Sequence, residues 1–298
     1  SDALRMLGIT TGVRCARSFS GRCGVAFVTI DLRRGLAASS SARTGKVALV
    51  TGGAKRIGRE ICLQLARNDY DVLIHCNRSV KEAELLVQEI EELSDGNARA
   101  AVVTADFSVQ SDTENLAETV RHHAFVSERG GLDALVLNAS TYETGAAFAH
   151  TSDDVSIEAS ATQELALLQK MMQVHVVASH TLSLRLVQEL RSSGNGSIVS
   201  IADTSLGKSW PRLSAYSSSK AALQQLMKSL AGDLAPHIRC NVVSPGAILP
   251  AEAVVEDWKH LVSKIPLRRS GTPAEIASAV LFLISNGYMN GHTLVCDG

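Results

Sequence analysis

The sequence predicts one doubly wound α/β domain over residues 46–298, and two patterns carry this prediction. Short apolar runs alternate along the chain with stretches of ten or more residues that have helical periodicity, which is the order of elements in a βαβ protein. The apolar runs are nearly continuous, as expected for strands buried on both faces of a parallel sheet. Neither a linker nor an internal repeat divides this segment, so we expect a single domain.

The expected strands are runs such as KVALVT and YDVLIHC, in which β-branched residues are frequent. They cover residues 46–51, 70–76, 99–105, 132–137, 196–201, 238–243 and 292–295. The expected helices, in which apolar residues recur at helical spacing, cover residues 60–68, 82–93, 113–123, 159–190, 216–234 and 273–285. Ligands bind beyond the C-terminal ends of the strands in such a sheet, so the residues that follow each strand are candidates for function.

The composition is that of a folded protein and limits its partners. Of the 298 residues, 45% are hydrophobic and 20% are charged, which excludes a disordered chain. The formal net charge of −1 argues against a nucleic-acid partner, and no apolar run reaches the roughly 18 residues of a membrane span. The six cysteines form no C-x-x-C pair and no cluster with zinc spacing, so we expect buried free thiols and no metal site.

Residues 1–45 differ in composition from the rest of the chain. They hold seven Arg, no Lys and two acidic residues, a net charge of +5, whereas the remaining residues hold 22 basic and 28 acidic residues, a net charge of −6. An Arg-rich, Ser-rich and acid-poor leader is typical of an organelle transit peptide, and a disordered extension has the same composition. We therefore expect a leader over 1–45, and a protein of the cytoplasm or of an organelle such as the mitochondrion or plastid.

A glycine-rich turn joins the first expected strand to the first expected helix and reads T-G-G-A-K-R-I-G over 51–58. Glycines there let the backbone turn tightly and approach a pyrophosphate group, which binds at the N-terminus of the helix. An ordinary βα turn would need neither three glycines nor two adjacent cations. The residues of this turn that we expect to bind a dinucleotide are Gly52, Lys55, Arg56, Ile57 and Gly58.

The residues after the second strand indicate which dinucleotide binds. An NAD site usually has an acidic residue here, which binds the ribose 2′-hydroxyl, whereas this sequence has Asn77, Arg78 and Ser79. The planar arginine side chain suits a phosphate dianion, so the sequence favours NADPH. After the third strand, Asp106 precedes Phe107 and is placed to accept a hydrogen bond from the adenine amino group.

The end of the fourth strand and a later helix supply the other candidates. Asn138, Ala139 and Ser140 have small side chains that let the main chain approach the cofactor. Tyr216 and Lys220 are spaced i, i+4, which places both on one face of a helix. A tyrosine titrates near pH 10, and we expect the ammonium group to lower that pKa. The pair would then transfer a proton while the cofactor transfers hydride.

Together these motifs resemble the short-chain dehydrogenase/reductase family over essentially all of residues 46–298. The tripeptide S-P-G over 244–246 and the final V-C-D-G also match that family. The resemblance implies a Rossmann-type sheet and a dinucleotide cofactor that Pro245 and Gly246 help to bind. It also implies that Tyr216 is the proton donor and that Lys220 binds the nicotinamide ribose.

Four departures from the general family narrow the resemblance. Arg56 stands where the family has glycine, and the fourth strand ends in N-A-S rather than N-N-A-G. Asp203 replaces the family's catalytic serine thirteen residues before Tyr216, and N-R-S over 77–79 occupies the 2′-phosphate position. With the segment LAPHIRCNVVSPGAIL over 234–249, these features resemble the pteridine reductases, which reduce biopterin and folate with NADPH.

This second resemblance implies a substrate site. Arg56 would contact a cofactor phosphate and the edge of the pterin, and Ser140 would hydrogen-bond both the pterin and the cofactor. Tyr142 would stack the pterin against the nicotinamide. Asp203 and Tyr216 would together deliver a proton to a ring nitrogen.

His175 stands where the family has an asparagine that helps to hold a water relay to the lysine. Two interpretations of His175 are open, a member of that relay or a buried histidine whose hydrogen bonds are satisfied, and we interpret His75 as structural. The resemblance also implies a homotetramer built from the helices over 159–190 and 216–234.

The sequence thus predicts an NADPH-dependent pteridine reductase that transfers hydride to biopterin or dihydrobiopterin, with folate and dihydrofolate as further candidate substrates. A short-chain carbonyl reductase, for example one acting on a 3-oxoacyl thioester, shares every feature except a reason for Asp203. A non-catalytic NADP-binding protein is the third alternative, and the Tyr216/Lys220 pair argues against it.

Overall fold

The computed structural model describes residues 45–145, 154–204, 206–207, 209–250 and 255–298. The expected leader lies outside these residues except for its last residue, and so do two of the six cysteines. The other four cysteines are free thiols, of which Cys62, Cys76 and Cys240 are buried and Cys296 is half-buried. The prediction of buried thiols is therefore confirmed for three of these four.

The strands of the described residues form one seven-stranded parallel sheet with the order β3-β2-β1-β4-β5-β6-β7. They are β1 (Lys46–Val50), β2 (Tyr70–Cys76), β3 (Ala100–Thr104), β4 (Ala134–Leu137), β5 (Gly196–Ile201), β6 (Ile238–Pro245) and β7 (Thr293–Cys296). Val50 at the end of β1 is in register with Ile74 in β2 and Val136 in β4. The strand order reverses between β1 and β4, which is where doubly wound sheets bind their ligands. The predicted Rossmann-type fold is confirmed.

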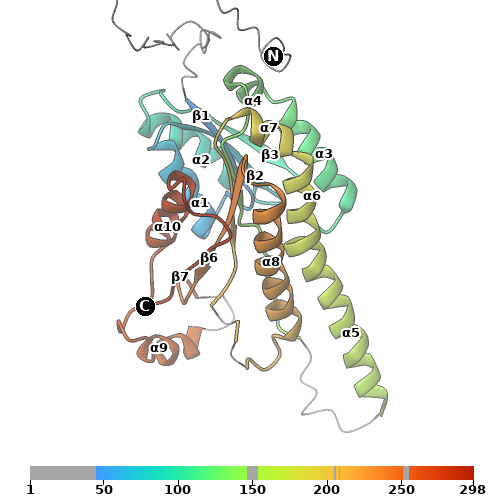
Figure 1. Ribbon diagram of the computed structural model, residues 1–298. Coiled ribbons are helices and arrows are strands. Elements are labelled where there is room, and N and C mark those ends of the chain that lie inside the picture. Colours follow the sequence, from blue (N-terminus) through green and yellow to red (C-terminus); the bar gives the residue numbers. More distant parts are fainter. Residues whose placement is uncertain (1–44, 146–153, 205, 208, 251–254) are drawn as a thin grey trace, which may run out of the picture. The chain divides into compact units, whose positions relative to one another are not determined.

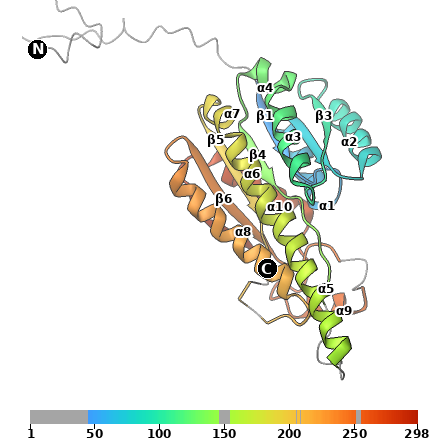
Figure 2. The ribbon, with the colours of Figure 1, turned by 90° about the vertical axis from the view of Figure 1, so that its right-hand side faces the viewer.

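Helices cover both faces of this sheet (Figures 1 and 2). One face packs against α1 (Arg56–Ala66), α2 (Val80–Leu93) and α10 (Pro273–Ser285). The other packs against α3 (Gln110–Arg121), α4 (Ala124–Arg129), α6 (Ala178–Arg185), α7 (Val187–Ser192) and α8 (Ser214–Asp233). Beyond one end of the sheet lie α5 (Asp154–Met172) and α9 (Val255–Ser263). No helix in the described part of the chain is long and apolar enough to cross a membrane.

The apolar pattern of the sequence explains this packing. The four residues of β1 from Val47 to Val50 are completely buried, because helices lie on both faces of the strand. In α1, Ile61 and Leu65 are one turn apart and face the same core as Val280 of α10. The start of α10 is fixed by a capping box, in which Thr272 and Glu275 bond each other's main-chain N–H groups.

The structure differs from the prediction in three helical regions. The single helix expected over 159–190 is α5 and α6 joined by a π-helical turn, Gln173–Val177, and followed by the separate helix α7. The helices α4 and α9 were not predicted, because six and nine residues are too few to show a clear period. The π-helical turn matters most for function, because it carries His175.

Arg239 in β6 is buried, and its guanidinium group holds the C-terminal end of α10. It donates hydrogen bonds to the carbonyl oxygens of Leu283 (2.7 Å) and Ile284 (2.6 Å), which have no acceptor role within the helix. Because a hydrogen bond from a charged donor contributes about 1.5–3 kcal/mol, we expect Arg239→Met to lower the free energy of unfolding by about 3 kcal/mol. Urea unfolding measures this change, and exposed Arg191→Met is the control, with an expected change below about 0.5 kcal/mol. Equal losses in the two variants would contradict the assignment.

Candidate active site

Two glycines shape the turn after β1. Gly52 has a φ of 62°, in the left-handed region that favours glycine. A Cβ atom on Gly58 would lie 2.1 Å from the carbonyl oxygen of Gly52, so only glycine fits there. The side chain of Ile57 packs against the core beneath α1. Only the main chain of Ile57 is therefore available to a ligand at this turn. The turn thus has the form of a phosphate-binding loop.

His75 hydrogen-bonds the main chain of this turn. The structure therefore confirms the prediction that His75 is a structural residue. The Gly52 N–H group donates to His75 Nδ1 (3.1 Å), so the ring proton is on Nε2, which donates to the Ala105 carbonyl oxygen (3.2 Å). Burial lowers the pKa of His75 to about 4, which keeps the ring neutral. The ring stacks on Phe107 at a centroid distance of 4.2 Å. Phe107 therefore directs its side chain into the protein, and its main chain is the part next to the predicted adenine site.

Three exposed cations lie around the turn, and each has a different partner. Lys55 pairs with Glu82 at the start of α2 (2.5 Å). Arg78 is exposed at the end of β2, and its charge helps to lower the pKa of Asp106, after the larger effect of the Ser108 hydroxyl. The Asn77 side chain also bonds Asp106. Ser79 precedes α2, and its hydroxyl makes no capping hydrogen bond.

The third cation, Arg56, is directed away from the turn. Its backbone has a φ of 55°, and its guanidinium group donates to the carbonyl oxygens of Leu249 (3.2 Å) and Pro250 (3.2 Å and 3.3 Å). Arg56 therefore links the turn after β1 to the segment after β6. A contact with a phosphate or a substrate requires the side chain to leave these carbonyl groups.

Hydrogen bonds attach the end of β4 to the same turn. The N–H groups of Asn138 (2.9 Å) and Ala139 (3.0 Å) both donate to Thr51 Oγ1. The Asn138 side chain donates to the carbonyl oxygens of Thr51 (2.9 Å) and Gly52 (3.0 Å). Asn138 thus fixes the main chain of the predicted cofactor site. Thr51 was not predicted as a site residue, although it is the first residue of the glycine-rich motif.

The predicted catalytic residues meet beyond the ends of β5 and β4. Tyr216, in the first turn of α8, donates from its hydroxyl to Asp203 Oδ2 (2.9 Å). Lys220 lies one turn further along α8, where its ammonium group donates to the Ile201 carbonyl oxygen (2.9 Å) and lies 5.9 Å from the centre of the Tyr216 ring. Both side chains are buried. The structure therefore places Asp203, Tyr216 and Lys220 together.

The electrostatics of this group differ from the prediction. Burial, and then the adjacent Asp203, raise the pKa of Tyr216 well above its usual range, so the expectation that Lys220 lowers this pKa is wrong. The physical reason is position, because a carboxylate contacts the phenol directly whereas the ammonium group bonds Ile201. Burial also lowers the pKa of Lys220 to about 8.

Tyr142 and Ser140 line the open side of this group. The Tyr142 ring meets the Tyr216 ring edge to face, with centroids 5.0 Å apart and a 74° angle between the planes. Its exposed fraction of 46% leaves part of the ring for a ligand. The Ser140 hydroxyl lies 3.0 Å from His175 Nε2. Burial, and then Asp203, raise the pKa of Tyr142.

Two contacts that the sequence did not predict join the segment after β4 to the segment before α8. The Gly145 N–H group donates to the Arg212 carbonyl oxygen (2.7 Å), and Arg212 Nε donates to the Gly145 carbonyl oxygen (3.0 Å). Nearby, Lys170 of α5 pairs with Glu143 (2.5 Å). These contacts join residues that are far apart in the chain, so no local sequence pattern predicts them.

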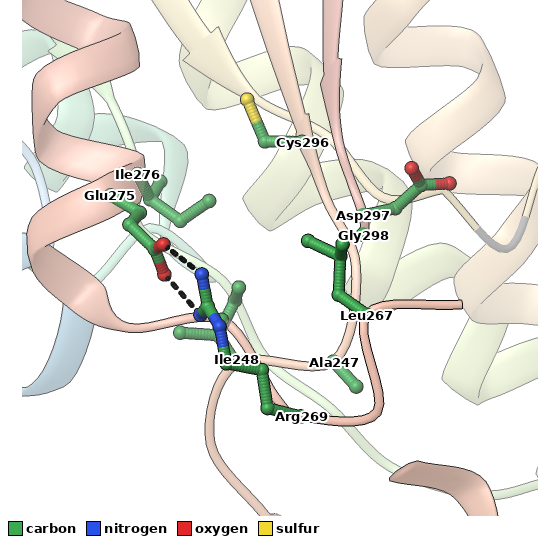
Figure 3. A pocket seen from close by; sticks show the side chains of 10 residues that line it. Ala247, Ile248, Leu267, Arg269, Glu275, Ile276, Cys296, Asp297 and Gly298 are labelled. Carbon is green, nitrogen blue, oxygen red and sulfur yellow. Dashed lines mark hydrogen bonds and ion pairs between the residues drawn. The ribbon is translucent and has the colours of Figure 1, made fainter. Parts of the chain in front are cut away.

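A pocket of about 180 Å³ opens beyond the ends of β6 and β7 (Figure 3). The Arg269–Glu275 ion pair and Cys296 are among its lining residues. It adjoins the predicted cofactor residues Pro245 and Gly246, since the Gly246 N–H group donates to the Cys296 carbonyl oxygen (2.9 Å). Its lining includes none of the predicted catalytic residues.

Comparison with known proteins decides the family. A family model described as short chain dehydrogenase matches residues 46–260. The chain belongs to the short-chain dehydrogenase family. One curated relative is carbonyl reductase family member 4 of Xenopus laevis, which is 30% identical over 257 residues, or 85% of this chain and 97% of that protein. Oxidoreductase chemistry follows from the family.

Two solved structures are similar to this chain along most of their length. One is FolM alternative dihydrofolate reductase 1 from Brucella canis complexed with NADP, with 32% identity, a TM-score of 0.72, and coverage of 86% of this chain and 94% of that one. The other is a blue fluorescent protein from a metagenomic library in complex with NADPH, with 28% identity, a TM-score of 0.72, and coverage of 86% and 97%.

Proposed function

We propose that this short-chain dehydrogenase is an NADPH-dependent pteridine reductase. The observation that carries the proposal is the hydrogen bond between Tyr216 and Asp203 (2.9 Å), a carboxyl and a phenol side by side at the reaction site. A pterin presents amide and amine edges, which a carboxyl group suits better than it suits a lone ketone. The similarity to an alternative dihydrofolate reductase supports the same substrate class.

The residues present fit NADPH. Because Gly58 has no Cβ atom, the first turn of α1 packs directly against the Gly52 carbonyl oxygen, so the glycine-rich turn leads straight into a helix N-terminus, where a pyrophosphate binds. Lys55 and Arg78 are exposed beside the ends of β1 and β2 and would hold the 2′-phosphate. Buried Lys220 would hold the nicotinamide ribose. NADPH, when bound, supplies the hydride.

The remaining side chains would orient and protonate the pterin. Ser140 would hydrogen-bond its edge, and the exposed part of the Tyr142 ring would stack on its face. Arg56 would join Ser140 at that edge once its guanidinium group has left the Leu249 and Pro250 carbonyl oxygens. The Tyr216 hydroxyl carries the proton that it shares with Asp203, and its raised pKa keeps it protonated at neutral pH. The pair would therefore deliver a proton to a ring nitrogen as the ring is reduced.

NADPH oxidation with biopterin, dihydrobiopterin, dihydrofolate and a 3-oxoacyl thioester tests the proposal. We expect turnover with at least one pterin or folate and a lower kcat/KM with the thioester. Turnover of the thioester alone would overturn it. Tight NADPH binding without turnover of any of the four would instead favour a non-catalytic NADP-binding protein.

A short-chain carbonyl reductase is the second candidate, and the likeness to carbonyl reductase family member 4 favours it. The variant Asp203→Ser separates the two candidates. If the Asp203 carboxyl group helps to protonate a pterin, Asp203→Ser should lower kcat/KM with the pterin by about tenfold or more, because general acid catalysis contributes about 10²–10⁴-fold to the rate. Activity with carbonyl substrates should persist or rise. An unchanged ratio of the two activities would count against the pterin.

Arg78 offers a test of cofactor choice. Because a charge-assisted hydrogen bond contributes about 1.5–3 kcal/mol, we expect Arg78→Ala to raise the KM for NADPH by about tenfold or more and to leave the KM for NADH within twofold. Steady-state kinetics with both cofactors measure the change. Exposed Arg67→Ala, at the end of α1, is the matched control and should change neither value. An equal effect on both cofactors would contradict a 2′-phosphate contact.

We also propose a homotetramer. Apolar side chains are exposed along α5 and α6, among them Leu165 and Leu184, which are 62% and 48% exposed. Such side chains suit a helix face covered by a second copy of the chain. Light scattering after gel filtration measures the assembly, and a monomer at micromolar concentration would contradict it.

A further inference from the structure

His175 is buried at the centre of the π-helical turn between α5 and α6, and both of its ring nitrogens have partners. The Thr141 N–H group lies 3.0 Å from Nε2, and the Ser219 hydroxyl lies 2.8 Å from Nδ1. Thr141 belongs to the segment after β4, and Ser219 belongs to α8. The imidazole ring therefore connects the two elements that carry the candidate substrate site.

The direction of each hydrogen bond follows from the donors. A main-chain N–H group can only donate, so Nε2 accepts from Thr141, and the single ring proton is on Nδ1. Nδ1 then donates to Ser219 Oγ, whose own proton goes to the Tyr216 carbonyl oxygen (2.7 Å). An unbroken chain of hydrogen bonds thus runs from Thr141 to the main chain of Tyr216.

Ser140 stands beside this chain rather than within it. Its hydroxyl lies 3.0 Å from Nε2, and its other acceptor is the Thr141 carbonyl oxygen at 3.4 Å. Because Nε2 is already satisfied by Thr141, Ser140 can turn its hydroxyl to a ligand without leaving a buried acceptor unpaired. His175 therefore fixes the position of Ser140 while leaving its hydroxyl available.

We propose that His175 is a positioning residue that, with its proton on Nδ1, holds Ser140 and the Tyr216 turn of α8 at a fixed separation. This excludes the proton relay, which was one of the two interpretations open from the sequence. A doubly protonated ring would direct an N–H group at the Thr141 N–H group. The titratable and charged groups that face the ring are Tyr216, 6.0 Å away between ring centres, and Lys220. Burial, and then the charge of Lys220, lower the pKa of His175 to about 3.

The first test needs no substrate, so it stands even if the proposed pteridine reductase activity fails. Nitrogen-15 NMR of the full chain reports the tautomer of each histidine ring, and comparison with His175→Gln assigns the signals of His175. We expect the Nδ1–H tautomer with no titration between pH 5 and pH 8. A midpoint within that range, or a proton on Nε2, would overturn the proposal.

The second test rests on the proposed function and uses whichever substrate of the panel is reduced. The variant His175→Phe has an aromatic ring of similar size without either nitrogen. We expect it to lower kcat by about tenfold or more, with less than a twofold change in the KM for NADPH and unchanged midpoints in the pH profile of kcat. Ser219→Ala should lower kcat similarly. The double variant His175→Phe/Ser219→Ala should have a kcat no lower than that of the slower single variant.

Two results would overturn the proposal. One is the loss, in His175→Phe, of an acidic limb that the pH profile of kcat has in the unchanged protein, and the other is strict additivity of the two single effects on kcat. Partial rescue in His175→Gln, which keeps an acceptor for Thr141, would support it.

Discussion

Turnover should fall by about 10³-fold in Tyr216→Phe, within the 10²–10⁴-fold range of proton transfer by a positioned side chain. The substitution removes a single hydroxyl group, which is the donor to Asp203 and the proton source that we assign to the reaction. The ring keeps its contacts with Tyr142 and its place in the first turn of α8. We therefore expect the folded structure and the cofactor site to be preserved.

Stopped-flow or single-turnover measurement of NADPH oxidation tests this prediction, because it separates the chemical step from product release. The Kd for NADPH should stay within about threefold, since no cofactor phosphate contact is lost. Tyr288→Phe is the control, because Tyr288 is fully exposed and far along the chain from the site. A residual rate within tenfold of the unchanged enzyme would show that another group donates the proton.

The fold could be predicted from the sequence because its strands are short and nearly uniformly apolar. The ranges expected for β2, β5 and α10 agree with the structure at both ends. The π-helical turn could not be predicted, because the apolar pattern continues through it, whereas only the main-chain hydrogen bonding distinguishes it from an α-helix. Helical periodicity reports which face is buried, and it does not report how tightly the backbone is wound.

The candidate site was predictable where function depends on position at a strand end. Asp203, Tyr216 and Lys220 meet because β5 and α8 bring them to the same edge of the sheet. The partners of the charged groups were not predictable. Lys220 bonds the carbonyl oxygen of Ile201, nineteen residues earlier, and Arg56 bonds carbonyl groups almost two hundred residues later.

These partners change how the site is understood. The spacing of Tyr216 and Lys220 suggested a tyrosine made more acidic by an ammonium group. The structure gives instead a phenol that is held protonated by Asp203, with a buried cation behind it. Such a phenol is a poor donor until charge develops on the substrate, so the cation is needed most as the proton leaves. Lys220 should therefore affect the rate more than it affects binding.

The ionisation of the Lys220 ammonium group should make kcat depend on pH. Its pKa of about 8 lies below the ordinary value of 10.5, so the ammonium group loses its proton as the pH rises through about 8. We expect kcat to fall above that pH with the slope of a single ionisation, because the neutral amine no longer stabilises the phenolate that forms on Tyr216. Lys220→Met should lower kcat by about 10²-fold or more at pH 7, and its pH profile should lack this alkaline limb.

The free energy of unfolding should rise with pH above pH 8, whereas kcat falls over the same range. Between pH 8 and pH 10.5 the unfolded chain binds the lysine proton and the folded chain does not, so this group's contribution to the free energy of unfolding rises with pH. Below pH 8 the buried charge is an unfavourable contribution of the order of 3 kcal/mol, which Lys220→Met removes. Urea unfolding of the cofactor-free protein and of this variant at pH 7.5 and 9.5 measures the difference, which should narrow by about 2 kcal/mol at the higher pH. A difference that stays constant, together with an alkaline limb that persists in Lys220→Met, would assign the ionisation to another group.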